Sequence, residues 1–199
     1  MKYPFFASFL VLCAVFYHNR KKSDKNYAKI MQDYFDRENE ANNTRKQPLD
    51  DLEYINLPSE LIDSIDSDDL TIKELVSDIE DIIKEPIVNF TGVSNTDLKL
   101  KYGPANLPYL QRCDFNYTQL VTHLYNLAKR LYEKDRKDIS LTILEYAISI
   151  KADISKIYYL AADIYKENNT SEKIANLISA AESLDSAMKN SIIKTLKNY

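Results

Sequence analysis

The residues best suited to catalysis are two histidines, His18 and His123, and two cysteines, Cys13 and Cys113. A serine or cysteine nucleophile needs a base within hydrogen-bond reach, and a zinc site needs three or four closely spaced Cys or His ligands. Neither histidine has a Ser, Cys or carboxylate neighbour in an activating pattern, and the cysteines are far apart in the chain. We therefore expect no enzymatic activity, no metal site and no cofactor.

An acidic cluster, Asp63, Asp66, Asp68 and Asp69, has the oxygen ligands that Ca²⁺ prefers. The Asp-x-Asp-x-Asp-Gly order and the Glu at the twelfth position of a calcium loop are missing. An amphipathic helical pattern follows from Leu70 and ends before Pro86, and Thr71 to Glu74 fits a capping box. Carboxylates at a helix N-terminus favour the helix dipole, which explains the cluster without an ion.

Both glycines, Gly92 and Gly103, lie in the stretch Val88 to Pro108. Neither a G-x-x-x-x-G-K phosphate loop nor a G-x-G-x-x-G motif is present, so nucleotide binding by those routes is excluded. Ser94 or Asn95 is expected to cap a short helix that Gly103 ends in a left-handed conformation, while Gly92 permits a turn. The alternative is a ligand-binding loop, whose polar residues would be Asn95, Thr96 and Asp97.

The N-terminal segment Tyr3 to Tyr17 carries no charge and is followed by a basic flank containing Arg20, Lys21, Lys22 and Lys25. As a helix it measures about 22 Å, against a hydrocarbon core of about 30 Å, so it is a short transmembrane anchor. The positive-inside rule then places the N-terminus outside the cell and the rest of the chain in the cytoplasm, as a single-pass cell-membrane protein. The alternatives are a core helix or a signal sequence that is removed.

Four parts of the chain are expected from these patterns. Residues 1–22 form the anchor with its basic flank, and 23–69 form a juxtamembrane helix, about Lys25 to Glu40, and a linker. Residues 70–116 form a helical N-terminal cap with Gly and Pro turns, and 117–199 form a repeat region that ends in a capping helix.

The repeat region matches itself at a spacing of 34 residues. Large and small side chains coincide in the pairs Leu124/Tyr158, Leu127/Ala161, Ala128/Ala162, Leu131/Tyr165, Leu144/Ile178 and Ala147/Ala181. Small residues on successive helices let two antiparallel helices approach closely. The region Val121 to Leu184 resembles two tetratricopeptide repeats, and departs from that family where Leu124 and Tyr158 replace the usual Trp.

The resemblance implies an α-helical solenoid in which the first helix of each pair lines a concave groove for a partner segment. The positions that correspond to the groove are Tyr125, Lys129, Tyr132, Tyr159, Asp163 and Lys166. Two tyrosines and mixed charges suit a peptide. The alternative is that these side chains are solvated or packed against the N-terminal part of the chain.

The whole chain resembles a group of uncharacterised, membrane-anchored, tetratricopeptide-like proteins of Gram-positive bacteria, which implies no activity. The formal net charge of -4 provides no basic surface for nucleic acid. The fold expected is all-α: a short N-terminal transmembrane helix, a linker and an α-α hairpin solenoid with a C-terminal capping helix. The function expected is a membrane-tethered, non-enzymatic scaffold or adaptor for a protein or peptide partner. The alternative is an accessory subunit of a membrane complex, with the repeat as a structural spacer.

Overall fold

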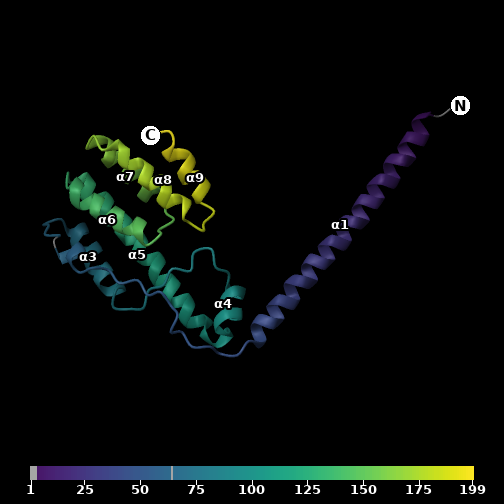
Figure 1. Ribbon diagram of the computed structural model, residues 1–199, viewed down its shortest axis with the longest axis horizontal. Helices are drawn as coiled ribbons and strands as arrows, with labels where there is room; N and C mark the ends of the chain where they lie inside the picture. The colour runs from purple at the N-terminus through teal and green to yellow at the C-terminus, as the bar shows by residue number, and fades with distance from the viewer. Residues whose placement is uncertain (1–3, 64) are drawn as a thin grey trace. The chain divides into compact units, whose positions relative to one another are not determined.

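The computed structural model describes residues 4–63 and 65–199, with side chains from residue 8 onward. Every regular element in the described residues is helical, which confirms the all-α class (Figure 1). The α-helices are α1 (Pro4–Asn43), α2 (Glu60–Asp63), α3 (Leu70–Ile82), α4 (Asn95–Tyr102), α5 (Leu107–Glu133), α6 (Lys137–Ser149), α7 (Ser155–Glu167), α8 (Ile174–Glu182) and α9 (Lys189–Leu196). Two 3₁₀ helices, η1 (Pro104–Asn106) and η2 (Ser171–Lys173), complete the set.

The chain divides into two compact units. The N-terminal unit comprises the residues up to Gln47 together with Asn95–Asn106, and the body comprises Pro48–Ser94 together with Leu107–Tyr199. The hydrophobic core formed by the helices α3 and α5 to α9 lies in the body.

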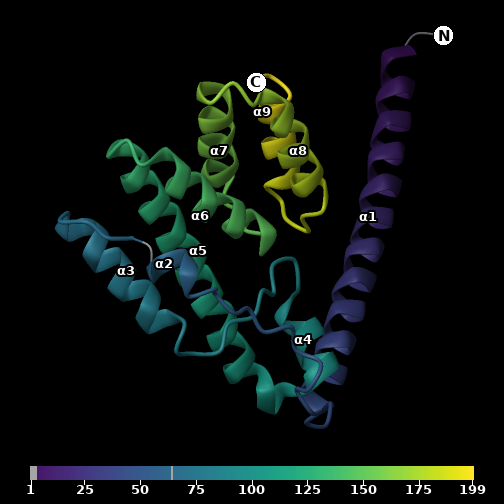
Figure 2. The same ribbon diagram turned by 60° about the vertical axis from the view of Figure 1, so that its left-hand side comes forward.

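The N-terminal unit consists of α1 with α4 and η1 packed on its last turns (Figure 2). Lys99 of α4 is 8% exposed, and its ammonium contacts the Glu38 carboxylate and lies 2.8 Å from Oδ1 of Asn42. Ala41 of α1 is fully buried. From residue 8 to residue 30 the side chains of α1 are exposed, because nothing in this unit covers them.

None of the helices in residues 4–63 and 65–199 has both the length and the apolar character needed to cross a membrane. The apolar run of α1 stops at Tyr17, and His18, Asn19 and the basic flank continue in the same helix. The expectation of a transmembrane helix is therefore not supported by these helices. Residues 1–3, which the expected anchor included, lie outside the described residues.

The body is built from helices that pack on their neighbours in chain order. Contacts join α3 to α5, α5 to α6, α6 to α7, α7 to α8, and α9 to both α7 and α8. In the contact of α5 with α6, Ala128 and Ser140 are both fully buried, and the Ser140 hydroxyl donates a hydrogen bond of 2.7 Å to the Ala128 carbonyl. Small side chains therefore allow this helical pair to pack closely.

Three of the helices in the body end on a non-glycine residue in the left-handed conformation. Asp135, Lys151 and Asn169 have φ values of 59°, 62° and 56° after α5, α6 and α7. In each case the next amide donates back into the last turn of the helix, for example Arg136 N–H to the Leu131 carbonyl at 2.9 Å. This geometry satisfies carbonyls that a helix end leaves free. Asp135 and Asn169 are also 34 positions apart.

The start of α3 differs from the expected capping box. Asp69, and not Thr71, is the N-cap residue: its Oδ1 accepts hydrogen bonds from the amides of Thr71 at 3.0 Å and Ile72 at 3.4 Å. A carboxylate at this position also interacts favourably with the helix dipole. Asp69 therefore provides both the N-cap that the sequence pattern assigned to Thr71 and the dipole interaction that it assigned to the acidic cluster.

The two glycines act as the sequence predicts. Gly92 and Gly103 have φ values of 84° and 83°, and α4 ends immediately before Gly103. The expected N-terminal cap, residues 70–116, is however divided between the two units. Helix α4 packs on α1 in the N-terminal unit, whereas α3 packs on α5 in the body.

Candidate functional site

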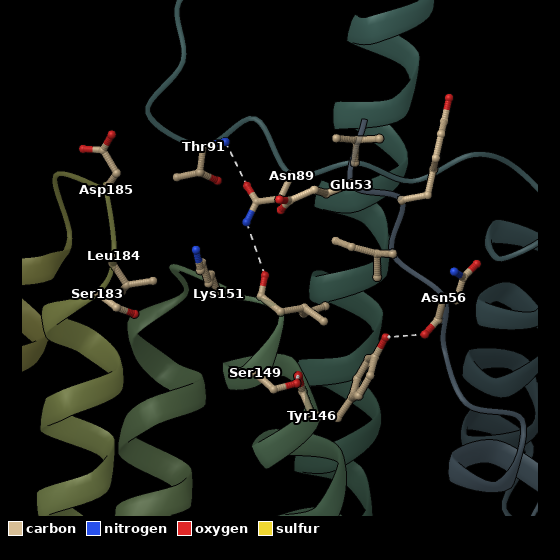
Figure 3. Close-up of a pocket in the computed structure, with 14 residues that line it drawn as sticks. Glu53, Asn56, Asn89, Thr91, Tyr146, Ser149, Lys151, Ser183, Leu184 and Asp185 are labelled. Atoms are coloured by element: carbon tan, nitrogen blue, oxygen red, sulfur yellow. Dashed lines mark hydrogen bonds between the residues drawn. The ribbon is translucent and has the colours of Figure 1, made fainter. Parts of the chain in front are cut away.

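A pocket of about 470 Å³ lies in the body where four chain segments meet (Figure 3). We call it the turn pocket, because two of these segments are turns between helices. It is lined by residues 53–56 of the connector, by Val88, Asn89 and Thr91 of the segment after α3, by Tyr146, Ser149, Ile150 and Lys151 at the end of α6, and by residues 183–185 of the α8–α9 turn.

Hydrogen bonds to main-chain atoms hold the connector and the segment after α3 in place. The Asn89 side chain donates to the Ile150 carbonyl at 3.2 Å, and its Oδ1 accepts from the Thr91 amide at 2.8 Å. The Ile55 amide donates to the Ile87 carbonyl at 2.9 Å. The Tyr146 hydroxyl reaches the Asn56 carbonyl at 3.2 Å (Figure 3). The pocket wall is therefore made from residues distant in sequence, and its shape depends on the folded body.

Glycine is required on one side of this pocket. A Cβ on Gly92 would lie 2.5 Å from the Asp185 carbonyl oxygen and 2.8 Å from the Asp185 Cγ. The turn at Gly92 thus touches the α8–α9 turn more closely than any other residue type allows. This contact closes the pocket between the segment after α3 and the C-terminal helices.

The rim of the turn pocket carries both signs of charge. Glu53, Lys151 and Asp185 are all exposed, and the Lys151 amino group points toward the segment of Asn89 and Thr91 (Figure 3). Lys151 is held at this position by the left-handed end of α6. A rim with both charges and with main-chain amides and carbonyls is suited to binding a polypeptide segment.

The hydroxyl groups of the pocket are already used by helix ends. Ser149 donates to the Tyr146 carbonyl and Ser183 to the Ala180 carbonyl, each at 2.7 Å. Beneath the pocket, the Tyr117 hydroxyl donates to the Ile150 carbonyl at 3.2 Å, and burial raises the pKa of Tyr117. Among these groups, no hydroxyl is paired with a base as an activated nucleophile would be.

The groove residues expected on α7 face the C-terminus of the chain. The Tyr159 hydroxyl donates to Thr195 of α9 at 3.1 Å, and the Lys166 ammonium lies 5.1 Å from the centre of the Tyr199 ring. Burial, with a hydrogen bond to Asp163, raises the pKa of Tyr199 to about 12. A partner segment on this surface would also meet α9 and Tyr199, and Asp163 and Lys166 are exposed there.

The groove residues expected on α5 are in different surroundings. The Tyr132 hydroxyl donates to Glu167 at 2.6 Å, and this hydrogen bond raises the pKa of Tyr132. Tyr125 is half-buried against the core. Lys129 is exposed, lies 3.8 Å from Glu133, and lines a shallow pocket of about 420 Å³ together with residues of α3.

The alternative loop site, Asn95, Thr96 and Asp97, forms the first turn of α4. The Thr96 hydroxyl donates to Glu38 at 2.7 Å, and Asp97 pairs with Arg37. Two of the three side chains therefore hold α4 to α1 and contribute to the structure of the N-terminal unit.

The structure also brings His123 close to Asp78, a contact that the sequence did not indicate. The Nε2 of His123 lies 3.4 Å from the Asp78 carboxylate of α3, while Nδ1 lies 2.8 Å from the Gln119 carbonyl. In residues 4–63 and 65–199 no group of three potential ligands could hold a metal ion. Cys113 is buried, and burial raises the pKa of its thiol.

No protein-family model, curated protein or solved structure matches this chain. The turn pocket was missed by sequence reasoning because its residues come from four segments with no shared spacing. One available signal was Asn89, which is followed closely by a glycine turn and precedes α4. A polar residue beside a glycine turn is typical of a contact between loops.

Proposed function

We propose that the chain is a non-enzymatic, membrane-tethered interaction protein, in which the apolar end of α1 enters the membrane and the body binds a partner segment. The observation that carries this proposal is the uncovered apolar end of α1. Phe9, Phe16 and Tyr17 are 58%, 74% and 69% exposed. A continuous apolar surface of this kind marks a membrane or protein interaction site.

The residues around this end support a membrane in particular. No charged side chain interrupts α1 between Pro4 and Tyr17, and four basic residues follow within eight positions. By the positive-inside rule, this arrangement supports a body on the cytoplasmic side of the cell membrane. An enzymatic fusion reporter at Tyr199 tests this side, and activity specific to an extracytoplasmic reporter would contradict it.

The body supports the interaction part of the proposal. Its helices pair in succession, and the left-handed residues Asp135 and Asn169 recur at the 34-residue spacing, which supports a tetratricopeptide-like arrangement. The turn pocket, with its mixed charges, is the surface that we assign to the partner segment. On the α7 side of the expected groove, the Tyr159 hydroxyl is already bonded to Thr195 of α9, so this side is less suitable.

The tether is tested by flotation of the full chain with neutral phosphatidylcholine vesicles. We expect the chain to float with the vesicles, and Phe9→Asp with Phe16→Asp to remain at the bottom of the gradient. Tyr34→Asp with Phe35→Asp, which changes exposed aromatic residues farther along α1, is the matched control and should still float. Failure of the unchanged chain to float would contradict the tether.

Partner binding is tested by a photo-crosslinker placed at Lys151 and, as a control, at the exposed Lys156 of α7. In native membranes we expect a discrete crosslinked product only at Lys151, and its loss when Glu53→Lys is added. Equal products at both positions would contradict a partner site in the turn pocket.

The second candidate is an accessory subunit of a membrane complex with the repeat as a spacer. The contacts of Tyr159, Asp163 and Lys166 with the chain's own C-terminus support it, since a spacer needs no open groove. Partner crosslinks confined to α1, with none on the body, would distinguish the spacer from the interaction protein.

A further inference from the structure

We infer that a basic band on α1 binds an anionic lipid surface, and that α1 enters this surface steeply. The basic band consists of Arg20, Lys21, Lys22, Lys25 and Lys29. This inference deepens the proposed membrane tether and rests on it. It predicts that the membrane is anionic and that the basic residues nearest the apolar end of α1 contribute most to binding.

The basic band carries a local charge opposite to that of the whole chain. Residues 18–32 contain these five basic side chains and one acidic one, Asp24, whereas the chain has a net charge of -4. Arg20 lies 4.0 Å from Asp24, with both side chains about three-quarters exposed. None of the four lysines pairs with a described carboxylate, and all are exposed. Their charge is therefore available to an external anionic surface.

The charge changes sign farther along the same helix. Asp33, Asp36, Glu38 and Glu40 make the last turns of α1 acidic, with Arg37 as the basic exception. An anionic membrane attracts the turns next to the apolar end and repels the distal turns. This gradient favours a helix that stands away from the surface, with its apolar end in the lipid.

The directions of the side chains also favour steep entry. At about 100° per residue, Lys21, Lys22, Lys25 and Lys29 fall on one side of α1, while Phe9, Phe16, Tyr27 and Tyr34 fall on the other. A helix lying flat on its aromatic side would direct these lysines into water. In a steep helix, Lys21 and Lys22 lie near the headgroups whichever way they point.

Steep entry makes the contribution of each lysine depend on its distance from Tyr17. With a rise of 1.5 Å per residue, Lys21 lies about 6 Å beyond Tyr17 and Lys29 about 18 Å. The Debye length at physiological salt is about 8 Å. Lys21 and Lys22 should therefore interact strongly with anionic headgroups, and Lys29 weakly.

The test mixes the full chain with equal amounts of two vesicle populations that separate by density, one of phosphatidylcholine alone and one with 30% phosphatidylglycerol. We expect most of the chain on the anionic vesicles, with this preference lost at 1 M NaCl. Each charge removed near the surface should reduce the anionic-to-neutral ratio by about fivefold. Lys21→Gln with Lys22→Gln should therefore reduce it by about 25-fold, and Lys29→Gln by less than twofold.

The outcomes separate this inference from the tether. Equal distribution between the two populations would overturn the anionic preference and leave the tether standing. A reduction of about fivefold or more by Lys29→Gln, the size expected for one charge near the surface, would overturn steep entry. Binding to neither population would overturn the tether and the inference together, and would assign the apolar end of α1 to a protein partner.

Discussion

The carboxylate of Asp69 lies 2.6 Å from the guanidinium of Arg130, 61 positions away in the sequence. The same carboxylate lies 3.0 Å from the Lys134 ammonium and accepts the first amides of α3. One side chain therefore begins α3 and attaches it to α5. This places α3 over the first helical pair of the body, which needs a neighbour to bury its apolar face.

Substituting Asp69→Asn should lower the melting temperature of the body, since Arg130 and Lys134 lose their charged partner. The matched control is Asp68→Asn, an adjacent exposed carboxylate, which should have little effect. Thermal unfolding followed by circular dichroism measures both. Equal melting temperatures for the two variants would show that the Asp69 contacts do not stabilise the body.

The same residue predicts a pH dependence. Hydrogen bonds from Arg130 and Lys134 hold the pKa of Asp69 far below its usual range. A carboxyl whose pKa is depressed by folding stabilises the protein above its unfolded pKa of about 3.9, and this stability is lost as the pH falls below that value. The unchanged protein should therefore lose more stability than Asp69→Asn between pH 5 and pH 2, as measured by urea unfolding. Parallel losses would contradict this assignment.

Replacing either glycine with alanine should destabilise a different unit. Each glycine has a positive φ, and a Cβ would lie 2.5 Å from the Asp185 carbonyl oxygen at Gly92 and 2.7 Å from that of Arg45 at Gly103. We expect a loss of about 1–3 kcal/mol for each. Hydrogen exchange should show Gly92→Ala weakening the α8–α9 turn and Gly103→Ala weakening α4. Val93→Ala, at an exposed neighbour, is the control, and an effect of equal size there would contradict the argument.

Two buried tyrosines should respond oppositely to loss of the hydroxyl group. Tyr158 is fully buried and its hydroxyl has no hydrogen-bond partner among the described residues, whereas the Tyr165 hydroxyl donates to Glu145 at 2.6 Å. Tyr158→Phe should leave the free energy of unfolding unchanged or raise it by up to about 1 kcal/mol, and Tyr165→Phe should lower it by about 1 kcal/mol. Urea unfolding measures both, and a loss at Tyr158→Phe would reveal a partner for its hydroxyl.

Burial also raises the pKa of Tyr158 to about 12. A tyrosine whose pKa is raised by folding stabilises the protein below the unfolded pKa of about 10, and this stability is lost as the pH rises toward 12. Tyr158→Phe should therefore lose less stability than the unchanged protein between pH 10 and pH 12. Identical losses would indicate that this hydroxyl titrates as it does in the unfolded chain.

Lys99 should control the attachment of α4 to α1. Its ammonium contacts Glu38 and Asn42 while the side chain is nearly buried. Lys99→Met keeps the apolar stem but removes the charge, and should increase amide exchange in residues 95–106 while leaving residues 107–199 unchanged. Lys101→Met, at an exposed position of the same helix, is the control. Unchanged exchange in 95–106 for Lys99→Met would show that apolar packing alone holds α4.

The local features of this protein were determined by its sequence. The 3.6-residue apolar periodicity predicted the helices of the body, and Gly103 and Gly92 predicted a left-handed helix end and a turn, because these depend on neighbouring residues and on backbone sterics. The small residues Ala128 and Ala147, both fully buried, likewise indicated that α5 and α6 pack closely together.

Only the tertiary structure decided which distant groups meet. Asp69 became the cap of α3 because Arg130 and Lys134 hold its carboxylate there, although the local pattern favoured Thr71. The sequence assigned Tyr159, Asp163 and Lys166 to a groove, and the structure adds that α9 and Tyr199 contact all three. The turn pocket combines four segments whose meeting depends on how whole helices pack. Periodicity fixes which face of a helix is apolar, but the choice of neighbour is set by the shape and charge of the surfaces that fold against each other.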